Sequence, residues 1–127
     1  MERPNAIKSV KDLMIYHLAF ELAMKIFELS KSFPREEIYS LTDQVRRSSR
    51  SVSINIREGY AKRKHEKVFR NQLIDSLGSA EESRGWLEYA QSCKYISDNQ
   101  FEDLDKRYAE LGAMINSLID KWQSFNK

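Results

Sequence analysis

Residues 40–64 read SLTDQVRRSSRSVSINIREGYAKRK, and the fold can be worked outward from this stretch. At about 100° per residue, one face of a helix through it would hold only apolar or small side chains. The members of this buried face are Leu41, Val45, Ser48, Val52, Ile56 and Gly59. Ser40 and Asp43 form a candidate capping pair, because a hydroxyl can accept from the free amides of the first turn and an acid suits the positive end of the helix dipole.

Two polar stripes run beside that face. The first, called here the polar stripe, lies roughly 100° round from the buried face and consists of Gln44, Arg47, Ser51, Asn55 and Glu58. Half-buried charges need partners. We therefore interpret the polar stripe as a layer beside the core, with Arg47 paired to Glu58 or to an acid of a neighbouring helix. The alternative is that it lines a functional cleft.

The second, called here the basic stripe, lies roughly opposite the buried face and consists of Arg46, Arg50, Ser53, Arg57 and Lys64. Either it is an ordinary solvated face, or it follows a phosphate backbone. The second interpretation gains weight because almost no acid interrupts the stripe, whereas exposed helices usually mix signs to form i,i+4 pairs.

A wider window shows the same imbalance of charge. Residues 44–70 hold nine bases and two acids, a formal charge of +7, and the net charge of +2 leaves −5 for the rest of the chain. A basic band on an otherwise acidic chain is the footprint expected for a polyanionic partner. The candidate phosphate contacts are Arg46, Arg50, Arg57, Lys62, Arg63, Lys64 and Lys67.

Composition limits the class of protein. The 127 residues suffice for one domain with a core, and only four glycines and two prolines interrupt them. No apolar run approaches the roughly 18–20 residues of a membrane span, and the first residues lack the apolar segment of a secretion signal. Cys93 is the only cysteine, so no internal disulfide can form. We therefore expect a cytoplasmic protein in which Cys93 is a small core residue.

Helical periodicity extends through the rest of the chain. It predicts four helices, at about residues 12–32, 40–63, 65–94 and 98–124, in a single domain. Short connectors between long amphipathic helices favour an all-α, antiparallel up-down-up-down four-helix bundle. Ser97 and Gln100 predict a capping box for the last helix. Gly59 indicates a close helix crossing or a bend, as well as the approach of the helix end. Gly78 predicts the close approach of another backbone, since glycine is otherwise unfavourable inside a helix.

The other core faces follow from the same spacing. For the first helix the predicted face is Tyr16, Ala19, Phe20, Ala23, Ile26, Phe27 and Ser30. For the third it is Phe69, Leu73, Leu77, Ala80, Leu87 and Ala90. For the last it is Phe101, Leu104, Tyr108, Leu111, Ile115, Leu118 and Trp122, which keep a heptad-like rhythm.

Catalytic and metal chemistry finds little support. A di-iron bundle needs Glu-x-x-His pairs, but Met14 precedes His17 and Lys62 precedes His65 at that spacing. No Cys-x-x-Cys, glycine-rich phosphate loop or nucleophile elbow occurs. The nearest enzyme pattern is a helical ribonuclease using Arg57 and His65. We expect no enzymatic activity, no cofactor and no metal.

A specific set of residues points to a known family. The set is Asp12-Leu13, Phe33-Pro34, Tyr39 and Leu41, Gln44 and Arg47, Ser51, Asn55-Ile56, Glu58-Gly59, Gly78-Ser79 and Glu82. With these the chain resembles the four-helix-bundle family of 23S ribosomal RNA intervening-sequence proteins, some relatives of which are described as ribosomal proteins. The resemblance runs from about Asp12 to Ile96. The chain departs from it at Ser48-Ser49, where small apolar residues are usual, and at Arg57, where alanine is common.

The resemblance implies an up-down bundle that assembles into a ring-shaped homo-oligomer, often a pentamer. Relatives are encoded within inserts in ribosomal RNA genes, and the family is similar to the accessory variability proteins of diversity-generating retroelements. Other relatives partner a reverse transcriptase and nucleic acid, so the resemblance implies RNA, such as ribosomal RNA, or another nucleic acid as the partner. It implies no established enzymatic activity. The matching polar residues also imply a structural network within or between subunits, formed by Gln44, Arg47, Ser51, Asn55, Glu58 and Glu82.

Two functions follow as hypotheses. The first is a non-enzymatic RNA-binding accessory protein whose basic stripe contacts phosphates. The alternative is a homo-oligomeric protein-interaction scaffold, without a nucleic-acid role, whose basic band meets an acidic protein.

Overall fold

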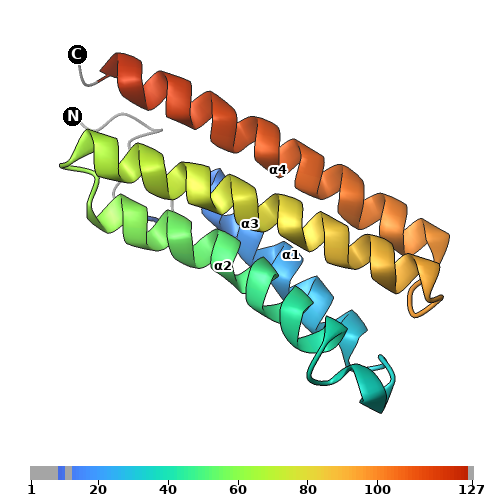
Figure 1. Cartoon of the computed structure of the whole chain (residues 1–127). Helices are drawn as coiled ribbons and strands as arrows, with labels where there is room; N and C mark the ends of the chain where they lie inside the picture. The colour runs from blue at the N-terminus through green and yellow to red at the C-terminus, as the bar shows by residue number, and fades with distance from the viewer. Residues whose placement is uncertain (1–8, 11–12, 126–127) are drawn as a thin grey trace.

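The computed structural model describes residues 9–10 and 13–125, and within that part of the chain the secondary structure is helical throughout. The elements are α1 (Met14–Ser30), the short 3-10 helix η2 (Arg35–Glu37), α2 (Leu41–Ala61), α3 (Glu66–Ser92) and α4 (Asp98–Phe125). Figure 1 shows successive α-helices running in alternating directions as an elongated bundle. The predicted all-α four-helix bundle is confirmed, and the helix ends lie within two residues of the predicted ones.

The helices pack in a ring around one core. Each α-helix contacts its neighbour in sequence, and α4 closes the ring against α1; the most extensive packing joins α2 to α3. All six residues of the predicted face of α2 are buried. The four central residues of the α4 face, Leu104 to Ile115 in heptad spacing, are buried as well. A heptad-like rhythm in α4 was therefore a good guide to its core side.

Buried serines let α2 and α3 pack closely. The hydroxyl of Ser83 donates to the hydroxyl of Ser48 at 2.9 Å, and Ser76 donates to the main-chain carbonyl of Val52 at 2.9 Å. Because a buried hydroxyl without a partner is costly, these bonds explain how a polar residue such as Ser48 is tolerated in the core.

The buried face of α1 is rotated from the predicted one. Ile15 and Leu22 are fully buried, whereas the side chain of Phe20 is 51% exposed. Tyr16 and Phe27 are only half-buried, at the edge of the core. The prediction was wrong for Phe20 because aromatic and aliphatic residues alternate around α1, and spacing alone does not say which of two adjoining apolar faces is covered.

The start of α2 is capped by a residue that the sequence pattern missed. The Ser40 hydroxyl donates to the Glu37 carboxylate at 2.6 Å instead of accepting from a helix amide, so the predicted role of Ser40 as a side-chain cap was wrong. The amide of Leu41 donates to the same carboxylate at 3.4 Å. The Tyr95 hydroxyl, before α4, donates to the second carboxylate oxygen at 2.9 Å. Glu37 thus joins η2, the start of α2 and the α3–α4 connection.

These contacts shift two pKa values. The hydrogen bonds from Ser40 and then Tyr95 hold the pKa of Glu37 below its ordinary value, because they stabilise the carboxylate. The bond to that carboxylate raises the pKa of Tyr95 to about 12. Both shifts favour the same state, an ionised Glu37 beside a neutral Tyr95.

The predicted capping box of α4 is confirmed. The Gln100 amide donates to the Ser97 hydroxyl at 3.0 Å, and the Ser97 amide donates to the Gln100 side-chain oxygen at 2.8 Å. The end of α3 is closed by Lys94, which has a positive φ of 64°. The amide of Tyr95 donates to the carbonyl of Ala90, which is the bond of a Schellman motif.

The two helical glycines behave differently. A Cβ on Gly59 would lie 2.8 Å from Cβ of Gln72 and 3.0 Å from a ring carbon of Phe69, so α2 and α3 cross closely there, as predicted. A Cβ on Gly78 would meet nothing within 4 Å, and the prediction of a close approach at Gly78 was wrong.

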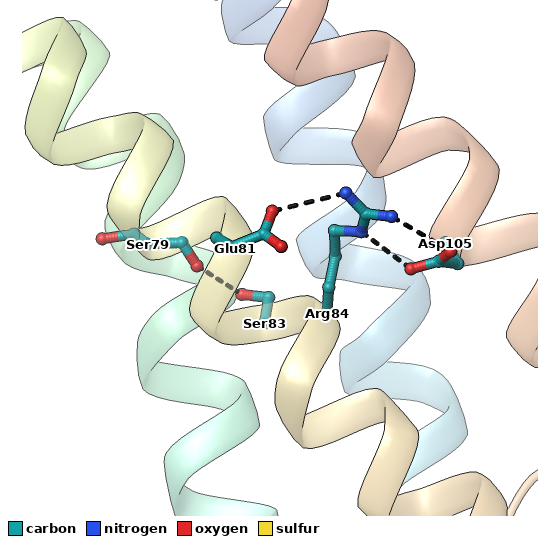
Figure 2. A network of polar contacts seen from close by, with 5 residues as sticks. All are labelled: Ser79, Glu81, Ser83, Arg84 and Asp105. Atoms are coloured by element: carbon teal, nitrogen blue, oxygen red, sulfur yellow. Dashed lines mark hydrogen bonds and ion pairs between the residues drawn. The ribbon is translucent and has the colours of Figure 1, made fainter.

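An arginine side chain links α3 to α4. Arg84 of α3 donates to both carboxylate oxygens of Asp105 in α4, at 2.7 and 3.2 Å, and to Glu81 at 3.3 Å (Figure 2). The hydrogen bond to Asp105 raises the pKa of the Arg84 guanidinium. Arg84 is therefore an example of a structural arginine in this bundle, because carboxylates on both sides of its guanidinium compensate its charge.

Candidate functional site

The polar stripe lies against α3, where two of its residues join a network. Asn55 donates to the carbonyl and the hydroxyl of Ser51, at 2.9 and 3.0 Å. Ser51 shares a hydrogen bond of 2.9 Å with Ser79 of α3, and Gln72 of α3 donates to the Asn55 side-chain oxygen at 3.2 Å. Ser51 and Asn55 therefore act as polar contacts between two helices.

The charged members of the polar stripe make contacts within α2 instead. Arg47 pairs with Asp43 at 3.0 Å, one turn earlier, and its side chain is 76% exposed. Glu58 pairs with Lys62 at 3.4 Å. The predicted pairing of Arg47 with Glu58 or with another helix is wrong for this chain, because Asp43 at i−4 supplies a nearer partner.

Glu82 and Gln44 also stand apart from the contacts between Ser51 and Asn55. Glu82 is exposed and accepts from the indole nitrogen of Trp86 at 2.9 Å. Gln44 is exposed on the first turns of α2 and lines a hollow described below. The six residues implied by the resemblance therefore do not form one network within the chain. Ser51 and Asn55 join α2 to α3, and the other four residues, Gln44, Arg47, Glu58 and Glu82, are exposed.

The basic stripe lies along the edge between α1 and α2 and not on the side opposite the core. Arg46 donates through Nε to the Ser30 hydroxyl at 2.8 Å, and its guanidinium lies 4.9 Å from the ring centre of Phe27. Arg50 lies 5.6 Å from the same ring. Ser53, predicted to face outward with them, is buried. The prediction of an outer face was wrong for Ser53, and Arg46 is half-buried, because this side of α2 borders α1; Arg50, Arg57 and Lys64 are exposed.

Arg57 follows the same edge toward the other end of α1. It donates through Nη1 to the Tyr16 hydroxyl at 3.0 Å, and its guanidinium lies 5.7 Å from the Tyr16 ring centre. The aromatic residues of α1 thus hold the arginines of α2 in place by cation–π and hydrogen-bond contacts, which use the face of each guanidinium and leave several N–H donors unused.

The charges of these arginines are uncompensated. Within the described part of the chain, no carboxylate forms an ion pair with Arg46, Arg50 or Arg57, although eight other ion pairs are present. Arg84 shows that the bundle can neutralise an arginine on both sides when its role is structural. Among the described residues, the positive charge of these three arginines is therefore not neutralised by a carboxylate.

A basic hollow opens at one end of the stripe, between the end of α1, η2 and the start of α2. It has a volume of about 710 Å³ and is lined by Ser30, Lys31, Phe33, Arg35, Ile38, Tyr39, Thr42, Asp43, Arg46, Arg47 and Arg50. Five of these residues are bases and one is an acid, Asp43, which is already engaged by Arg47. Lys31 pairs with Glu28 at 3.2 Å. Among the described residues, Arg35, Arg46 and Arg50 have no such partner, and their positive charge suits an anion.

Three members of the basic hollow were missed by sequence reasoning. Lys31 and Arg35 flank Phe33-Pro34, outside the helix whose wheel was analysed. Thr42 lies in the first turn of α2; its hydroxyl is buried and has no hydrogen-bond partner among the described residues. A buried hydroxyl of this kind needs an explanation, and the chain bend at Pro34 is the one sequence signal that could have brought Lys31 and Arg35 toward α2.

The remaining predicted bases lie at the other end of α2. Arg63 donates to the Tyr60 carbonyl at 3.0 Å and lies 4.1 Å from the Tyr60 ring centre. Lys62, Lys64 and Lys67 are exposed, and Lys62 is the one paired with Glu58. At 1.5 Å of rise per residue, about 24 Å separate Arg46 from Lys62 along the helix. The band is therefore long, and its two ends cannot contact the same phosphate.

The histidines and the cysteine do not lie together in a site among the described residues. His17, His65 and Cys93 are all exposed, so the expectation of Cys93 as a core residue was wrong. Across residues 9–10 and 13–125, no three His, Cys, Asp or Glu side chains are grouped as metal ligands would be. Among the same residues, no helix is long and apolar enough to cross a bilayer.

Comparisons with known proteins agree with the fold. A family model described as "23S rRNA-intervening sequence protein" matches residues 11–117. The structure is similar to a crystal structure of a protein with unknown function from the S23 ribosomal protein family of Bacteroides thetaiotaomicron VPI-5482. The two share 28% sequence identity and a TM-score of 0.75 over 84% of this chain and 98% of that chain. A comparison with curated proteins finds no match.

Proposed function

Because the chain belongs to the 23S rRNA-intervening sequence protein family, we propose that it is a non-enzymatic protein that associates with RNA. The basic stripe and the basic hollow contact the phosphate backbone, and the bases at the α2–α3 junction extend that contact. The family description motivates the choice of RNA as the partner, and the charge distribution supports the choice of surface.

One observation supports this proposal more than the others. Arg46, Arg50 and Arg57 form a row along one edge of the bundle, held by Phe27 and Tyr16 and not by carboxylates. Aromatic and hydroxyl contacts position a guanidinium without cancelling its charge. A row of positioned, uncancelled arginines can bind successive phosphates with little side-chain entropy left to lose.

The test is affinity for a labelled structured RNA, measured by fluorescence anisotropy. We expect Arg50→Gln with Arg57→Gln to weaken binding about tenfold or more, because each charge-assisted hydrogen bond is worth about 1.5–3 kcal/mol. The matched control is Lys25→Gln with Arg107→Gln, which removes the same charge from residues paired to Asp103 and Glu21 on the α1–α4 side. Equal loss in both variants would reduce the effect to net charge and contradict the proposal.

The ring-shaped homo-oligomer is the second part of the proposal. Its support is a set of large apolar side chains that are exposed on a single chain: Met14, Phe20 and Met24 of α1, Ile54 of α2 and Ile74 of α3. Single exposed apolar residues are normal on a monomer, and the proposal is that assembly covers several of these side chains at once. Light scattering on the purified protein tests it: an assembly has a multiple of the 15.0 kDa chain mass, five times for a pentamer. A single-chain mass at micromolar concentration would overturn it.

The protein-interaction scaffold stays the alternative function. In that case an acidic protein, and not RNA, would occupy the basic stripe. A partner recovered by pull-down after nuclease treatment, together with no RNA binding by the pure protein, would replace the present proposal.

A further inference from the structure

A second hollow adjoins the basic one and has a different chemistry. It has a volume of about 440 Å³ and is lined by Glu37, Tyr39, Ser40, Leu41, Gln44, Trp86, Tyr89 and Cys93. Three of these residues are aromatic, and we call Tyr39, Trp86 and Tyr89 the aromatic ledge. No lysine or arginine lines this hollow.

The ledge is open to solvent in the single chain. Tyr39 is 94% exposed and Tyr89 is 62% exposed, values that are high for large aromatic residues. The rings of Trp86 and Tyr89 lie 5.8 Å apart and are inclined by 36°, and the Trp86 indole is fixed by its hydrogen bond to Glu82. The Trp86 ring is therefore held in place, with the Tyr89 ring beside it.

The two hollows meet at one residue. Tyr39 lines both the basic hollow and the hollow of the aromatic ledge. It lies between η2 and α2, directly beyond Ile38. A ligand that reaches across Tyr39 would therefore meet five bases on one side and three aromatic rings on the other.

The hollow of the aromatic ledge and the basic hollow differ in charge, and this difference suits them to different parts of a ligand. Glu37 lines the aromatic side and is ionised, since its hydrogen bonds lower its pKa, and Glu82 is exposed beside Trp86. Carboxylates repel phosphate but accept hydrogen bonds from the amino groups of bases. Gln44, which lines the same side, can hydrogen-bond the polar edge of a base. The aromatic side thus suits an uncharged base, and the basic side suits a phosphate.

We propose that the basic hollow and the aromatic ledge together form a binding site for an unpaired stretch of RNA, with a phosphate in the hollow and its bases stacked on Tyr39, Trp86 and Tyr89. This rests on the proposed RNA association and names the form of RNA. In a duplex the bases are paired and stacked on one another, so they cannot reach the ledge, whereas bases of a single strand can be splayed onto aromatic rings.

The experiment compares a short labelled RNA strand that has no secondary structure with the same strand annealed to its complement. We expect Tyr39→Ala and Tyr89→Ala each to weaken binding of the single strand roughly 5- to 100-fold and to leave duplex binding unchanged. Tyr39→Phe and Tyr89→Phe keep the ring and should bind as the unmodified protein does. Val68→Ala, which truncates an exposed apolar residue of α3 outside both the RNA site and the proposed oligomer interface, is the control for surface changes.

Tryptophan emission gives a second readout. Stacking of a base near Trp86 should quench emission when the single strand is added, and Trp86→Phe should abolish that change while the signal of Trp122 remains. Quenching by the duplex to the same extent would overturn the site.

The outcomes separate this inference from the proposed function. If the alanine variants bind the single strand normally while Arg50→Gln weakens binding of both RNA forms, the ledge is not part of the site and the RNA association stands. If neither RNA form binds, both proposals fall. If a labelled acidic peptide displaces the single strand from the hollow with higher affinity, the occupant is a protein and the RNA site is overturned.

Discussion

Glu37 shows how one side chain outside the long helices can hold three segments together. Its carboxylate accepts from the Ser40 hydroxyl, the Leu41 amide and the Tyr95 hydroxyl. Sequence patterns favour Ser40 as the cap of α2, because serine is common there. Glu37 could not have been identified from the sequence, since its third partner lies on a connection that only the folded bundle brings near.

The pKa shifts of this cluster give the first prediction. Tyr95 has a pKa raised from 10.0 to about 12, so its contribution to stability is complete below pH 10 and is lost as the pH rises through about 12. Glu37 has a lowered pKa, so its contribution is present above its ordinary value of 4.5 and is lost as the pH falls. Glu37→Gln should return the Tyr95 pKa toward 10.0, which phenolate absorbance against a Tyr95→Phe reference measures. An unchanged Tyr95 titration would contradict the contact.

Lys94 gives a second prediction for a single residue. It holds the left-handed position after α3, with φ of 64°, where glycine is favoured. Lys94→Gly should raise the free energy of unfolding by about 1 kcal/mol, because a side chain in this conformation costs roughly that much. Urea denaturation measures the change. Lys94→Ala is the control: it removes the charge but keeps a Cβ, so an equal gain there would show that the conformation is not the cause.

At the scale of helices, spacing predicted where each one begins and ends and which side of α2, α3 and α4 is covered. Those patterns are local, and in these three helices the predicted face coincides with the buried residues of the core. Helical spacing did not predict which neighbouring helix lies against the other faces of each helix. The basic stripe was therefore placed opposite the core, although it borders α1, and Phe20 was placed inside although it is exposed.

The two helical glycines provide a matched prediction about the α2–α3 crossing. Gly78→Ala should stabilise the protein by about 1 kcal/mol, because alanine favours the helix and the added Cβ meets nothing. Gly59→Ala gains the same helix propensity, but its Cβ would lie 2.8 Å from Cβ of Gln72. Overpacking of this kind typically costs about 1–3 kcal/mol, so we expect a net loss of stability. Thermal unfolding of both variants measures the two changes in stability. Higher stability of Gly59→Ala would contradict the close crossing, because it would mean that α2 and α3 can move apart at no cost.

At the scale of the whole molecule, the candidate site combines residues from three elements. Lys31 closes α1, Arg35 begins η2, and Arg46 and Arg50 lie on α2. Net charge and the basic segment could be predicted from the sequence because charge is additive along the chain. Their convergence could not, because it depends on the turn at Pro34 and on the packing angle of α1 against α2. The same packing places Tyr39 between the basic hollow and the aromatic ledge.

The salt dependence of RNA binding tests the central claim most directly. The claim is that uncompensated arginines on the α1–α2 edge contact phosphates. The observed binding constant of a single-stranded RNA should fall steeply with salt, and the slope of its logarithm should become shallower by about 2 when Arg46, Arg50 and Arg57 are all changed to Gln. Circular dichroism of the triple variant is the check that it is folded. A binding constant indifferent to salt, or the same slope for both proteins, would contradict the account.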